Sequence, residues 1–425
     1  MKLVCTPLAR ALPARSDSTL PVLLYGRSDG RSSVSIGAAI NEDLNRRGFA
    51  VSSEMRDLLS LALSVIAADV AVLKPKSADG WTREIELVVS VSQPDSWNSK
   101  CSLIEQILRF LTTDIWKVSF VTCDQEFELP KQVLKSSSEV VSLLSGGIDS
   151  LVGALDLTAD GLRPFVVSQT VMGDADKQVK FAKEIAGGLE HLQLNHNVHW
   201  AETNDKNQRA RSFIFLTYGI LAATCTETYE AGKTVTIYVC ENGLISINPP
   251  LTASRVGSLS TRTTHPVFIS LLQRLLNELG FRVLLKNPYQ FKTKGEMLAE
   301  CRDQAYLLAN AHLATSCGRY RRNGLKHCGR CVPCLIRRAA FFRWPLQDQS
   351  IYVYSNLGLV DSHHSGFDDV RSAAMAVAEL DELGINRILG SSLSSALILD
   401  ADSLRSVAER GLREVGAFLS NAGVK

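Results

Sequence analysis

The stretch that most constrains the fold is Val140–Ser150, an apolar run followed by two glycines and a second apolar segment. The branched residues of its first half predict a buried strand, and the periodic residues after the glycines predict a helix. Gly146 and Gly147 allow a sharp turn and a close approach of the backbone to a ligand. Because the first amides of a helix attract anions, this loop suits a phosphate, with hydroxyl groups at Ser145 and Ser150 as further donors.

Asp149 narrows the ligands that fit this loop. A carboxylate repels a bare phosphate, but a magnesium ion can bridge a carboxylate and phosphate oxygens. The alternative interpretation is a plain strand-to-helix turn in which Ser145 or Asp149 caps the helix. The loop lacks the Gly-Lys-Ser or Gly-Lys-Thr ending of a Walker loop, which argues against a phosphoryl-transferring NTPase.

The string Ser-Gly-Gly-Ile-Asp-Ser after a predicted strand resembles the pyrophosphate-binding loop of the PP-loop ATP pyrophosphatases. That resemblance implies an adenine nucleotide alpha hydrolase-like fold and cleavage of ATP to AMP and pyrophosphate. It also implies which residues bind the nucleotide: Ser145, Gly146, Gly147, Ile148, Asp149 and Ser150.

Length and composition set the class of protein. A chain of 425 residues predicts two or three domains, and a net charge of only +2 does not indicate a general nucleic-acid binder. The content of 45% hydrophobic and 21% charged residues is typical of a soluble globular protein. Residues 1–7 lack the apolar core of a secretory signal, and no stretch of membrane-spanning length is free of charge. We therefore expect a cytoplasmic protein.

The pattern of strands and helices predicts an α/β protein. Residues 1–135 are expected to form an N-terminal α/β accessory domain, with strands at 20–25, 84–91 and 116–123 and helices at 54–72 and 102–111. From Val140 strands and helices alternate, which favours a doubly wound parallel sheet in an ATP-binding domain spanning 136–345. The later strands are expected at 163–168, 197–201 and 234–240, and residues 346–425 are expected to form a helical extension.

A long polar loop follows the strand predicted at 234–240. It begins at Glu241, passes Arg255 and ends near Arg262 and His265. Loops of this length are uncommon unless they bind a ligand or cover a site, and the alternative is a long surface loop. Glu241 suits a substrate amine or magnesium, while Arg262 and His265 suit a carboxylate or phosphate.

Two lysines stand at the start of a predicted helix. Lys292 and Lys294 are placed to neutralise the phosphate charge of ATP, which makes them catalytic candidates together with Asp149. The alternative is an ordinary solvated charge cluster. Further on, Arg337 and Arg338 are expected to face the site or a polynucleotide, and His363-His364 is more typical of a loop than of a metal site.

Four of the ten cysteines form the second strong motif. Ten residues separate Cys317 from Cys328, and two residues lie in each gap from Cys328 to Cys331 and from there to Cys334. Short Cys-x-x-Cys turns can aim sulfurs at one metal while the longer loop supplies the fourth, so the spacing favours one structural zinc ion per chain. An iron–sulfur cluster is the competing occupant.

The loop and the cysteines together resemble the 7-cyano-7-deazaguanine synthase (QueC) family from Val140 to about Phe342. The shared features are the loop, Lys292-Thr293-Lys294 before a helix, and the cysteine spacing with Arg337 after it. In that family ATP adenylates the carboxylate of 7-carboxy-7-deazaguanine, ammonia displaces AMP, and a second activation gives the nitrile. The resemblance implies zinc on the four cysteines and magnesium with ATP.

The chain departs from that family in three places. Residues 1–135 and the last helices are additions, the loop from Glu241 to His265 does not follow the usual pattern, and Ser168-Gln169-Thr170 lacks the expected Tyr-Gly-Gln string. Extended chains of this size resemble the QatC family of Qat anti-phage defence systems and the QueC-like proteins of some cyclic-oligonucleotide defence operons. That likeness implies the same activation step with another acceptor.

The sequence therefore predicts an adenylating ligase that forms a C–N bond to a 7-deazaguanine-type acid. Its expected partners are ATP, the acid, and a protein acceptor or operon partner bound by the N-terminal domain; a homodimer is compatible with this, and no membrane is expected. Three alternatives stay open: a nitrile synthase of deazapurine biosynthesis, a non-enzymatic nucleotide-sensing or assembly subunit, and an enzyme of tRNA thiolation or other nucleic-acid modification.

Overall fold

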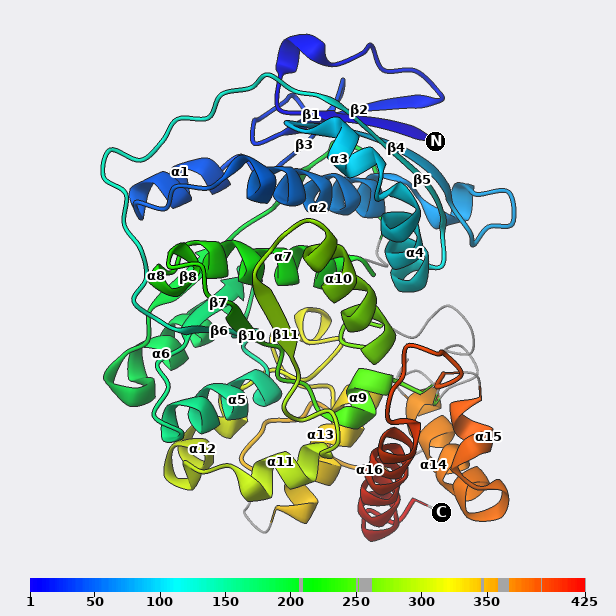
Figure 1. Cartoon of the computed structure of the whole chain (residues 1–425). Helices are drawn as coiled ribbons and strands as arrows, with labels where there is room; N and C mark the ends of the chain where they lie inside the picture. The colour runs from blue at the N-terminus through cyan, green and yellow to red at the C-terminus, as the bar shows by residue number, and fades with distance from the viewer. Residues whose placement is uncertain are drawn as a thin grey trace. The chain divides into compact units, whose positions relative to one another are not determined.

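The computed structural model describes residues 1–205, 209–249, 251, 262–344, 348–357, 367–390 and 392–424. It is a mixed α/β structure with parallel sheets, as predicted (Figure 1). Arg255 and His363-His364 lie outside the described residues. Across the described part of the chain, no helix combines the length and the apolar character needed to cross a membrane.

Backbone contacts divide the chain into two compact units. The first contains Met1–Val141, Leu192–Ile237 and Phe268–Leu284, and the second contains Ser142–His191, Tyr238–Val267 and Leu285–Lys425.

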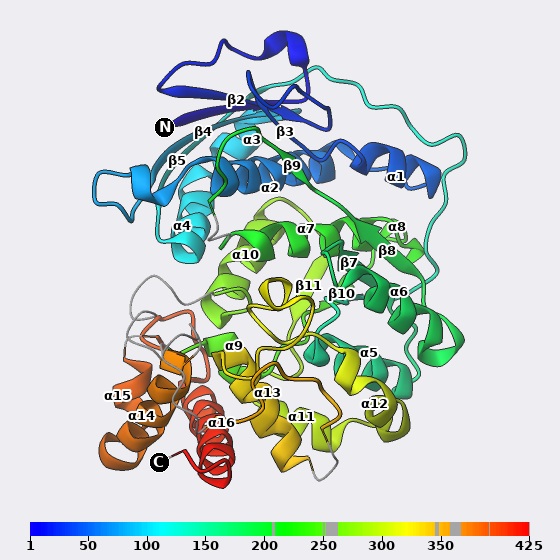
Figure 2. The same ribbon diagram turned by 180° about the vertical axis from the view of Figure 1, so that it is seen from behind.

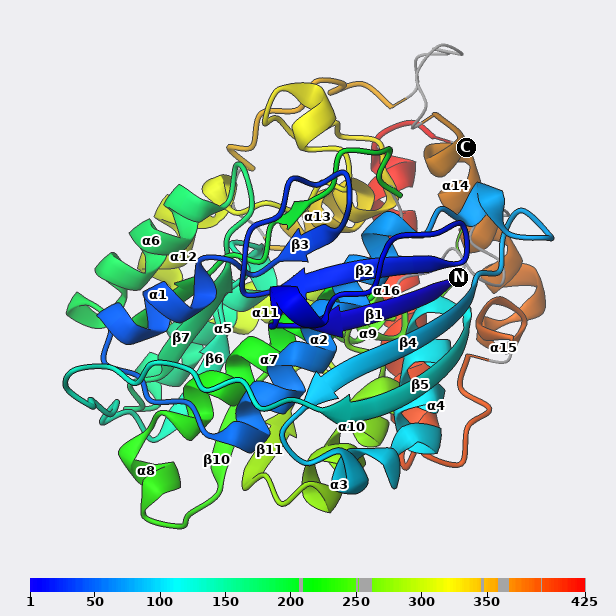
Figure 3. The same ribbon diagram turned by 90° about the horizontal axis from the view of Figure 1, so that it is seen from above.

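The first unit contains a six-stranded sheet in the order β5-β4-β1-β2-β3-β9. Strand β1 pairs in parallel with both β2 and β4, which run side by side with it in Figure 3, and only β9 is antiparallel. Strands β2 and β3 follow β1 on one side, and the chain then crosses to β4 on the other side of β1. The strand order therefore reverses between β1 and β4. The strands are β1 (Lys2–Thr6), β2 (Thr19–Leu24), β3 (Val34–Ile36), β4 (Glu84–Val91), β5 (Ile115–Thr122) and β9 (Val198–His199).

Helix α2 (Ser53–Ala71) is the central helix of this unit. It is rich in leucine and alanine, and it buries nearly every side chain from Met55 to Val70 against β2, β3, β4 and α7. Its first turn is capped by the Ser52 hydroxyl, which accepts a hydrogen bond from the Met55 amide at 3.3 Å. The other helices that lie within this unit are α1 (Ile40–Arg46), α3 (Pro94–Asn98), α4 (Cys101–Thr112), α7 (Arg211–Thr224) and α8 (Glu227–Glu230).

A second sheet has five strands in the order β11-β10-β6-β7-β8. Its first strand in sequence again lies in the centre, and the order reverses between β6 and β10. Ligands of doubly wound sheets bind outside the carboxyl ends of the strands at such a reversal. Each of the two sheets therefore defines one favoured place for a ligand. The strands are β6 (Val140–Leu143), β7 (Phe165–Gln169), β8 (His191–Leu194), β10 (Val235–Tyr238) and β11 (Val283–Lys286).

Most predicted elements of the chain are confirmed to within two residues, and one is wrong. The third strand after the loop is β8 at His191–Leu194, not the segment 197–201, of which Val198–His199 pairs with β3 in the other sheet. Residues 191–194 alternate between partly buried and buried positions, the period of a half-buried strand, over too few residues to stand out. The strand predicted at 197–201 thus exists only as the two residues of β9, and its place in the other sheet follows from tertiary pairing, which no local pattern encodes.

Several helices of the second unit pack around α13. In Figure 2, α13 lies beside α11, and it also packs against α16. The predicted C-terminal helices are present as α14 and α16, and they share an apolar core with α9 and α13. The three-domain division stays a prediction. The helices are α5 (Ile148–Ala159), α6 (Ala175–Glu184), α9 (Gly243–Ile247), α11 (Lys294–Glu300), α12 (Gln304–Asn310), α13 (Val332–Arg343), α14 (Phe367–Leu383), α15 (Ile385–Leu389) and α16 (Ala401–Asn421), while α10 (Pro266–Glu278) precedes β11.

A glycine lets α5 approach the end of β10. A Cβ atom at Gly153 would lie 2.3 Å from Sγ and 2.7 Å from Cβ of Cys240. We expect Gly153→Ala to lower the free energy of unfolding by about 1–3 kcal/mol, because the two elements must separate to admit the methyl group. Chemical denaturation measures this cost. In a Cys240→Gly background, which removes both opposing atoms, the cost should largely disappear; an equal cost in the two backgrounds would contradict the close approach.

Candidate functional site

The predicted anion loop is a tight turn held by its own serines. Gly146 has a φ of +86°, in the left-handed region that favours glycine, and Gly147 is the N-cap of α5. The Ser145 amide donates to Ser150 Oγ at 3.2 Å, and Ser150 Oγ donates to the Gly147 carbonyl at 2.9 Å. The hydroxyls therefore shape the loop, and the start of the twelve-residue helix α5 faces the carboxyl end of β6.

Two other segments of the second unit fix the same loop. The Thr315 amide donates to the Gly146 carbonyl at 2.9 Å, and Gly147 forms a parallel bridge with Thr315. From α6, Gln178 Nε2 donates to the Ser145 carbonyl at 2.9 Å, and Lys177 Nζ donates to Thr315 Oγ1 at 2.6 Å. Because Thr315 lies two residues before Cys317, the glycine loop and the cysteine cluster are joined by one short segment of chain.

Asp149 is the centre of the polar contacts at this edge of the sheet. Its side chain is 5% exposed, and its Oδ2 atom accepts from Asn242 Nδ2 at 2.7 Å and from the Asn242 amide at 3.2 Å. Its Oδ1 atom lies 2.6 Å from Lys294 Nζ. Three elements thus converge here: the start of α5, the segment after β10 and the start of α11. This is the place where the strand order reverses, the favoured ligand position of the second sheet.

The charge of Asp149 is set by two opposed effects. Burial alone would raise its pKa, but the Lys294 ammonium and the hydrogen bonds from Glu241 and Asn242 together lower the pKa to about 2. The aspartate is therefore ionised at neutral pH inside a largely dry site.

The pKa of Glu241 is shifted in the opposite direction. Burial, the charge of Asp149 and the hydrogen bond between the two carboxyl groups raise the pKa of Glu241 well above its usual value. Its Oε1 atom also accepts from Asn242 Nδ2 at 3.2 Å. The environment thus favours the protonated form of Glu241 beside the charged Asp149. Two adjacent carboxyl groups are a site where a divalent cation can take the place of a proton.

The raised pKa of Glu241 predicts how its replacement changes stability with pH. Protonated Glu241 contributes stability below its unfolded pKa of about 4.3, and this contribution is lost as pH rises toward the folded pKa. We expect Glu241→Gln, which keeps a donor toward Asp149, to be more stable than the wild type at pH 7–8 and the difference to shrink toward pH 4. Urea denaturation across this range measures it. A difference that does not vary with pH would contradict the raised pKa.

The structure separates the two predicted catalytic lysines. Lys294 is 8% exposed, and its position is fixed by the capping box at the start of α11, where Thr293 Oγ1 accepts from the Glu296 amide at 3.0 Å. Lys292 pairs instead with Glu300 at 2.7 Å, and its side chain is 40% exposed. The geometry thus brings Lys294, and not Lys292, to Asp149.

The other two predicted substrate residues form a separate group before α10. His265 is buried, and its Nδ1 atom accepts from the Val267 amide at 3.2 Å. Burial and then the charge of Arg262 lower the pKa of His265 to about 4, so the imidazole is neutral at physiological pH. Among the described residues, the partners of Asp149 are Glu241, Asn242 and Lys294, so Arg262 and His265 are not part of its contact set.

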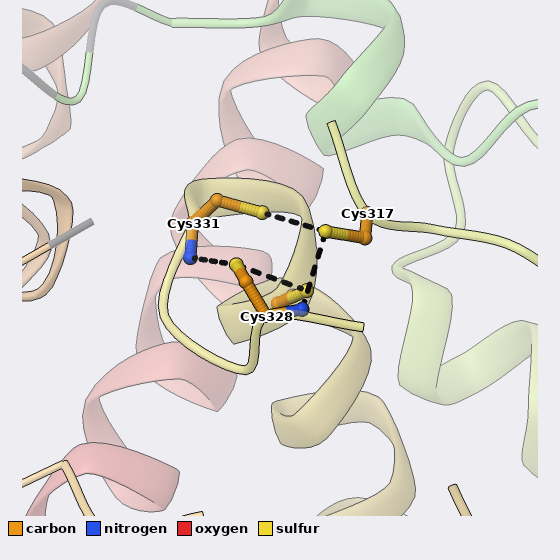
Figure 4. A group of neighbouring side chains, drawn as sticks. Cys317, Cys328 and Cys331 are labelled. Carbon is orange, nitrogen blue, oxygen red and sulfur yellow. Dashed lines mark hydrogen bonds between the residues drawn. The ribbon is translucent and has the colours of Figure 1, made fainter. Parts of the chain in front are cut away.

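The four clustered cysteines come together as the spacing predicts (Figure 4). All four sulfurs lie within 4.8 Å of one another, with Cys317 and Cys331 at 3.8 Å and Cys328 and Cys334 at 3.9 Å. Zn–S bonds of about 2.3 Å in a tetrahedron place sulfurs about 3.8 Å apart. The cluster therefore suits one tetrahedral ion such as zinc. A multi-iron cluster would spread the thiolates further because iron and sulfide lie between them.

Backbone amides surround this cluster. The amides of Arg319 and Cys328 donate to Cys317 Sγ at 3.3 Å, and the Cys331 amide donates to Cys328 Sγ at 3.2 Å. Cys331 is the N-cap of α13, and Cys334 lies in the first turn of that helix. Amide donors and a helix start stabilise negative charge on sulfur, which matches the thiolate form that binds a metal.

Neighbouring polar side chains support the cluster without joining it. His327 is buried, and its Nε2 atom accepts from the Ser316 amide at 3.2 Å. Arg337 is fully buried and donates to the carbonyls of Ala314 at 2.7 Å and Ala311 at 2.8 Å. Arg337 therefore fixes the segment that leads to Thr315 and Cys317. Of the two expected roles of Arg337, facing the site or a polynucleotide, burial leaves only the first, because a fully buried guanidinium cannot reach a polynucleotide.

Sequence reasoning missed Lys177, Gln178 and Thr315 as residues that fix the glycine loop. A signal was available for the first two, because they follow β7, the strand next to β6, and the carboxyl ends of neighbouring parallel strands meet at one edge of a sheet. No local pattern marks Thr315, which joins the loop only through tertiary pairing.

Comparison of the chain with protein-family models, curated proteins and solved structures found no match.

Proposed function

We propose that the protein is a PP-loop ATP-dependent ligase, with its ATP site in the second unit, that adenylates the carboxylate of a 7-deazaguanine-type acid and passes the acyl group to a nitrogen nucleophile. One observation carries this proposal. Asp149 follows the glycine loop and meets Lys294 at 2.6 Å, together with Glu241 and Asn242, at the reversal of strand order. The motif that resembles a pyrophosphate loop therefore lies beside a cation and a carboxyl pair.

Each group in this site has a role in the proposal. The loop from Ser145 to Ser150 and the start of α5 bind the pyrophosphate part of ATP, because helix N-termini favour anions. Lys294 offsets the charge that develops on the leaving group. Asp149 and Glu241 fit magnesium, since two adjacent carboxyl groups otherwise retain a proton between them. Magnesium held there supplies Lewis-acid stabilisation of the departing pyrophosphate.

The proposed reaction needs no nucleophilic side chain. A carboxylate oxygen of the acid attacks the α-phosphorus of ATP, an O–P bond forms, and the bond from that phosphorus to the bridging oxygen breaks as pyrophosphate leaves. A nitrogen lone pair then attacks the acyl carbon, the bond to AMP breaks, and the nitrogen loses a proton. Positioning and charge stabilisation are what the protein contributes.

The choice of acid and acceptor rests on the resemblance to the extended QueC-like proteins of defence systems. Residues 1–135 are an addition to the family core, and we propose that this part of the first unit receives a protein acceptor whose nitrogen takes the acyl group. If ammonia were the acceptor, the same activation would lead through an amide to the nitrile, so the product distinguishes the two routes.

ATP–pyrophosphate exchange tests the activation step. With metal-loaded full-length protein, 7-carboxy-7-deazaguanine and magnesium, we expect exchange that depends on the acid. Asp149→Asn should lower the exchange rate about 100-fold or more. Asp160→Asn, at the exposed end of the same helix, is the matched control and should leave the rate unchanged. Absence of acid-dependent exchange by the wild type would overturn the proposed function, and mass spectrometry of the products separates amide from nitrile.

A further inference from the structure

The first unit carries a pocket at the corresponding place in its own sheet. Its strand order reverses between β1 and β4, and a pocket of about 190 Å³ lies where both strands end. Ligands of doubly wound sheets bind at this position. The lining comes from the carboxyl ends of β1 and β4 and from the first turn of α2, and it includes Pro7, Ser53, Arg56, Asp57 and Ser92.

Arg56 is a buried guanidinium in this lining with no carboxylate partner among the described residues. Its side chain is 8% exposed, Nη1 donates to Asn41 Oδ1 at 2.7 Å, and the guanidinium carbon lies 3.9 Å from the ring centre of Phe127. A neutral amide and an aromatic face orient the cation but do not neutralise it. Burial of an uncompensated charge is costly unless a counter-charge is bound.

Arg83, a second deeply buried arginine of the same unit, shows a contrast with Arg56. Arg83 is 1% exposed and has two carboxylate partners, Asp69 at 2.7 Å and Asp114 at 2.5 Å. The unit thus neutralises Arg83 internally and leaves Arg56 facing a cavity.

Asp57 lines the same pocket, but its oxygens are occupied. Oδ1 accepts from the Ser92 amide at 2.8 Å, and Oδ2 accepts from Ser92 Oγ at 2.7 Å and Trp97 Nε1 at 3.1 Å. These three donors fix the carboxylate toward β4 and α3. Its role is to attach α2 to the end of β4, and Arg56 retains its positive charge for the pocket.

The first turn of α2 adds a second attraction for an anion. This helix has 19 residues, and Ser53 at its first position is exposed and lines the pocket. The partial positive charge of the helix start and the Arg56 guanidinium therefore act on the same space. A neighbouring hollow of about 730 Å³ shares Pro7, Gln125 and Phe127 with the pocket, which gives room for the rest of a small molecule.

We propose that the first unit binds the oxyanion group, a phosphate or a carboxylate, of a small molecule between Arg56 and the start of α2. This site is separate from the proposed ATP site, since its residues all belong to the first unit. The ligand group forms a bidentate contact with the guanidinium, and the remainder extends over Phe127 into the neighbouring hollow.

The test uses full-length protein with Lys294→Met, so that anion binding at the proposed ATP site is weakened. The probes are inorganic phosphate and acetate, each compared with chloride at equal ionic strength, and the unfolding temperature is measured against anion concentration. We expect a saturable increase with at least one of the two probes. Ser53→Asn is the control variant. It should show the same increase in unfolding temperature, because this exposed position tolerates a neutral polar side chain.

Ser53→Asp is the decisive variant. An aspartate at the first helical position favours the helix itself, so loss of the saturable increase cannot be explained by unfolding. Arg56→Gln should abolish the increase as well, while Arg109→Gln, at an exposed arginine of α4, should retain it. A full increase with Ser53→Asp and Arg56→Gln, or no saturable increase with either probe, would overturn the site. Acid-dependent exchange by the wild type is unaffected by either result, so the two proposals fail separately.

Discussion

Replacement of Cys331 by alanine is expected to abolish metal binding and to lower the free energy of unfolding by about 4 kcal/mol or more, the range typical of losing a structural metal. All four sulfurs are within 4.8 Å of one another, so removal of one leaves an incomplete tetrahedron. The effect extends beyond the cluster, because Cys331 and Cys334 lie at the start of α13, whose apolar side chains belong to the core that includes α14 and α16.

Metal analysis and chemical denaturation together measure this result. The wild type should contain one metal ion per chain, and Cys331→Ala should contain none. Cys225→Ala removes a cysteine that is equally buried but lies outside the cluster, and it should retain the metal with a loss of only about 1 kcal/mol, as expected for a small cavity. Stoichiometric metal in Cys331→Ala would contradict the four-sulfur site. Absence of visible colour in the wild type would separate zinc from an iron–sulfur cluster.

The metal site is expected to affect the glycine loop as well. Thr315 binds the loop at Gly146 and Gly147, and Arg337 holds the segment between Ala311 and Ser316. If the cluster lost its order, the segment between Ala311 and Ser316 would no longer hold the glycine loop through Thr315. Metal removal by a chelator should therefore lower ATP-dependent exchange in parallel with metal content.

The sequence predicted best the parts of the site whose geometry is local. Three of the cysteines follow one another at two-residue gaps in a single turn, and the glycine loop needs only a strand, a turn and a helix start. Such short segments can adopt few other shapes, so the residue types almost determine them.

The polar residues far apart in the sequence could be named but not assigned to one site. Lys292 and Lys294 look equivalent as sequence, and only the capping box at Thr293 decides which of them is turned inward. Arg262 and His265 form a group of their own near α10 because the chain between Glu241 and that helix is long. Tertiary packing, which no local pattern encodes, selects among such candidates.

The pocket of the first unit is a second feature that local sequence patterns could not predict. Arg56 stands near the start of a helix rich in leucine and alanine, where an arginine is usually exposed on the polar face. Its burial follows from the strand order, which carries α2 across the sheet to the reversal between β1 and β4. No catalytic motif marks residues 1–135 in the sequence, whereas the strand order places Arg56 at the ligand position of this sheet.

Lys294→Met is expected to lower the acid-dependent exchange rate by about 100- to 1,000-fold, the usual cost of removing one group that stabilises developing charge. Lys292→Met is the matched control, since the same substitution two residues away removes a lysine that pairs with Glu300 at the surface. Its rate should change less than about threefold, because a screened surface pair contributes little. Equal losses in the two variants would contradict the assignment of Lys294 to the site.

Stability measurements separate catalysis from folding in the same pair of variants. Lys294 lowers the pKa of Asp149, so the ion pair contributes stability that is present above the unfolded pKa of about 3.9 and is lost as pH falls toward 2. Lys294→Met should therefore be less stable than Lys292→Met at pH 7, and the gap should close on acidification below pH 4. If the exchange rate of Lys294→Met stays low at temperatures where denaturation shows the chain to be fully folded, the loss of rate is a loss of catalysis. If the exchange rate returns when the fold is stabilised, Lys294 has a structural role alone.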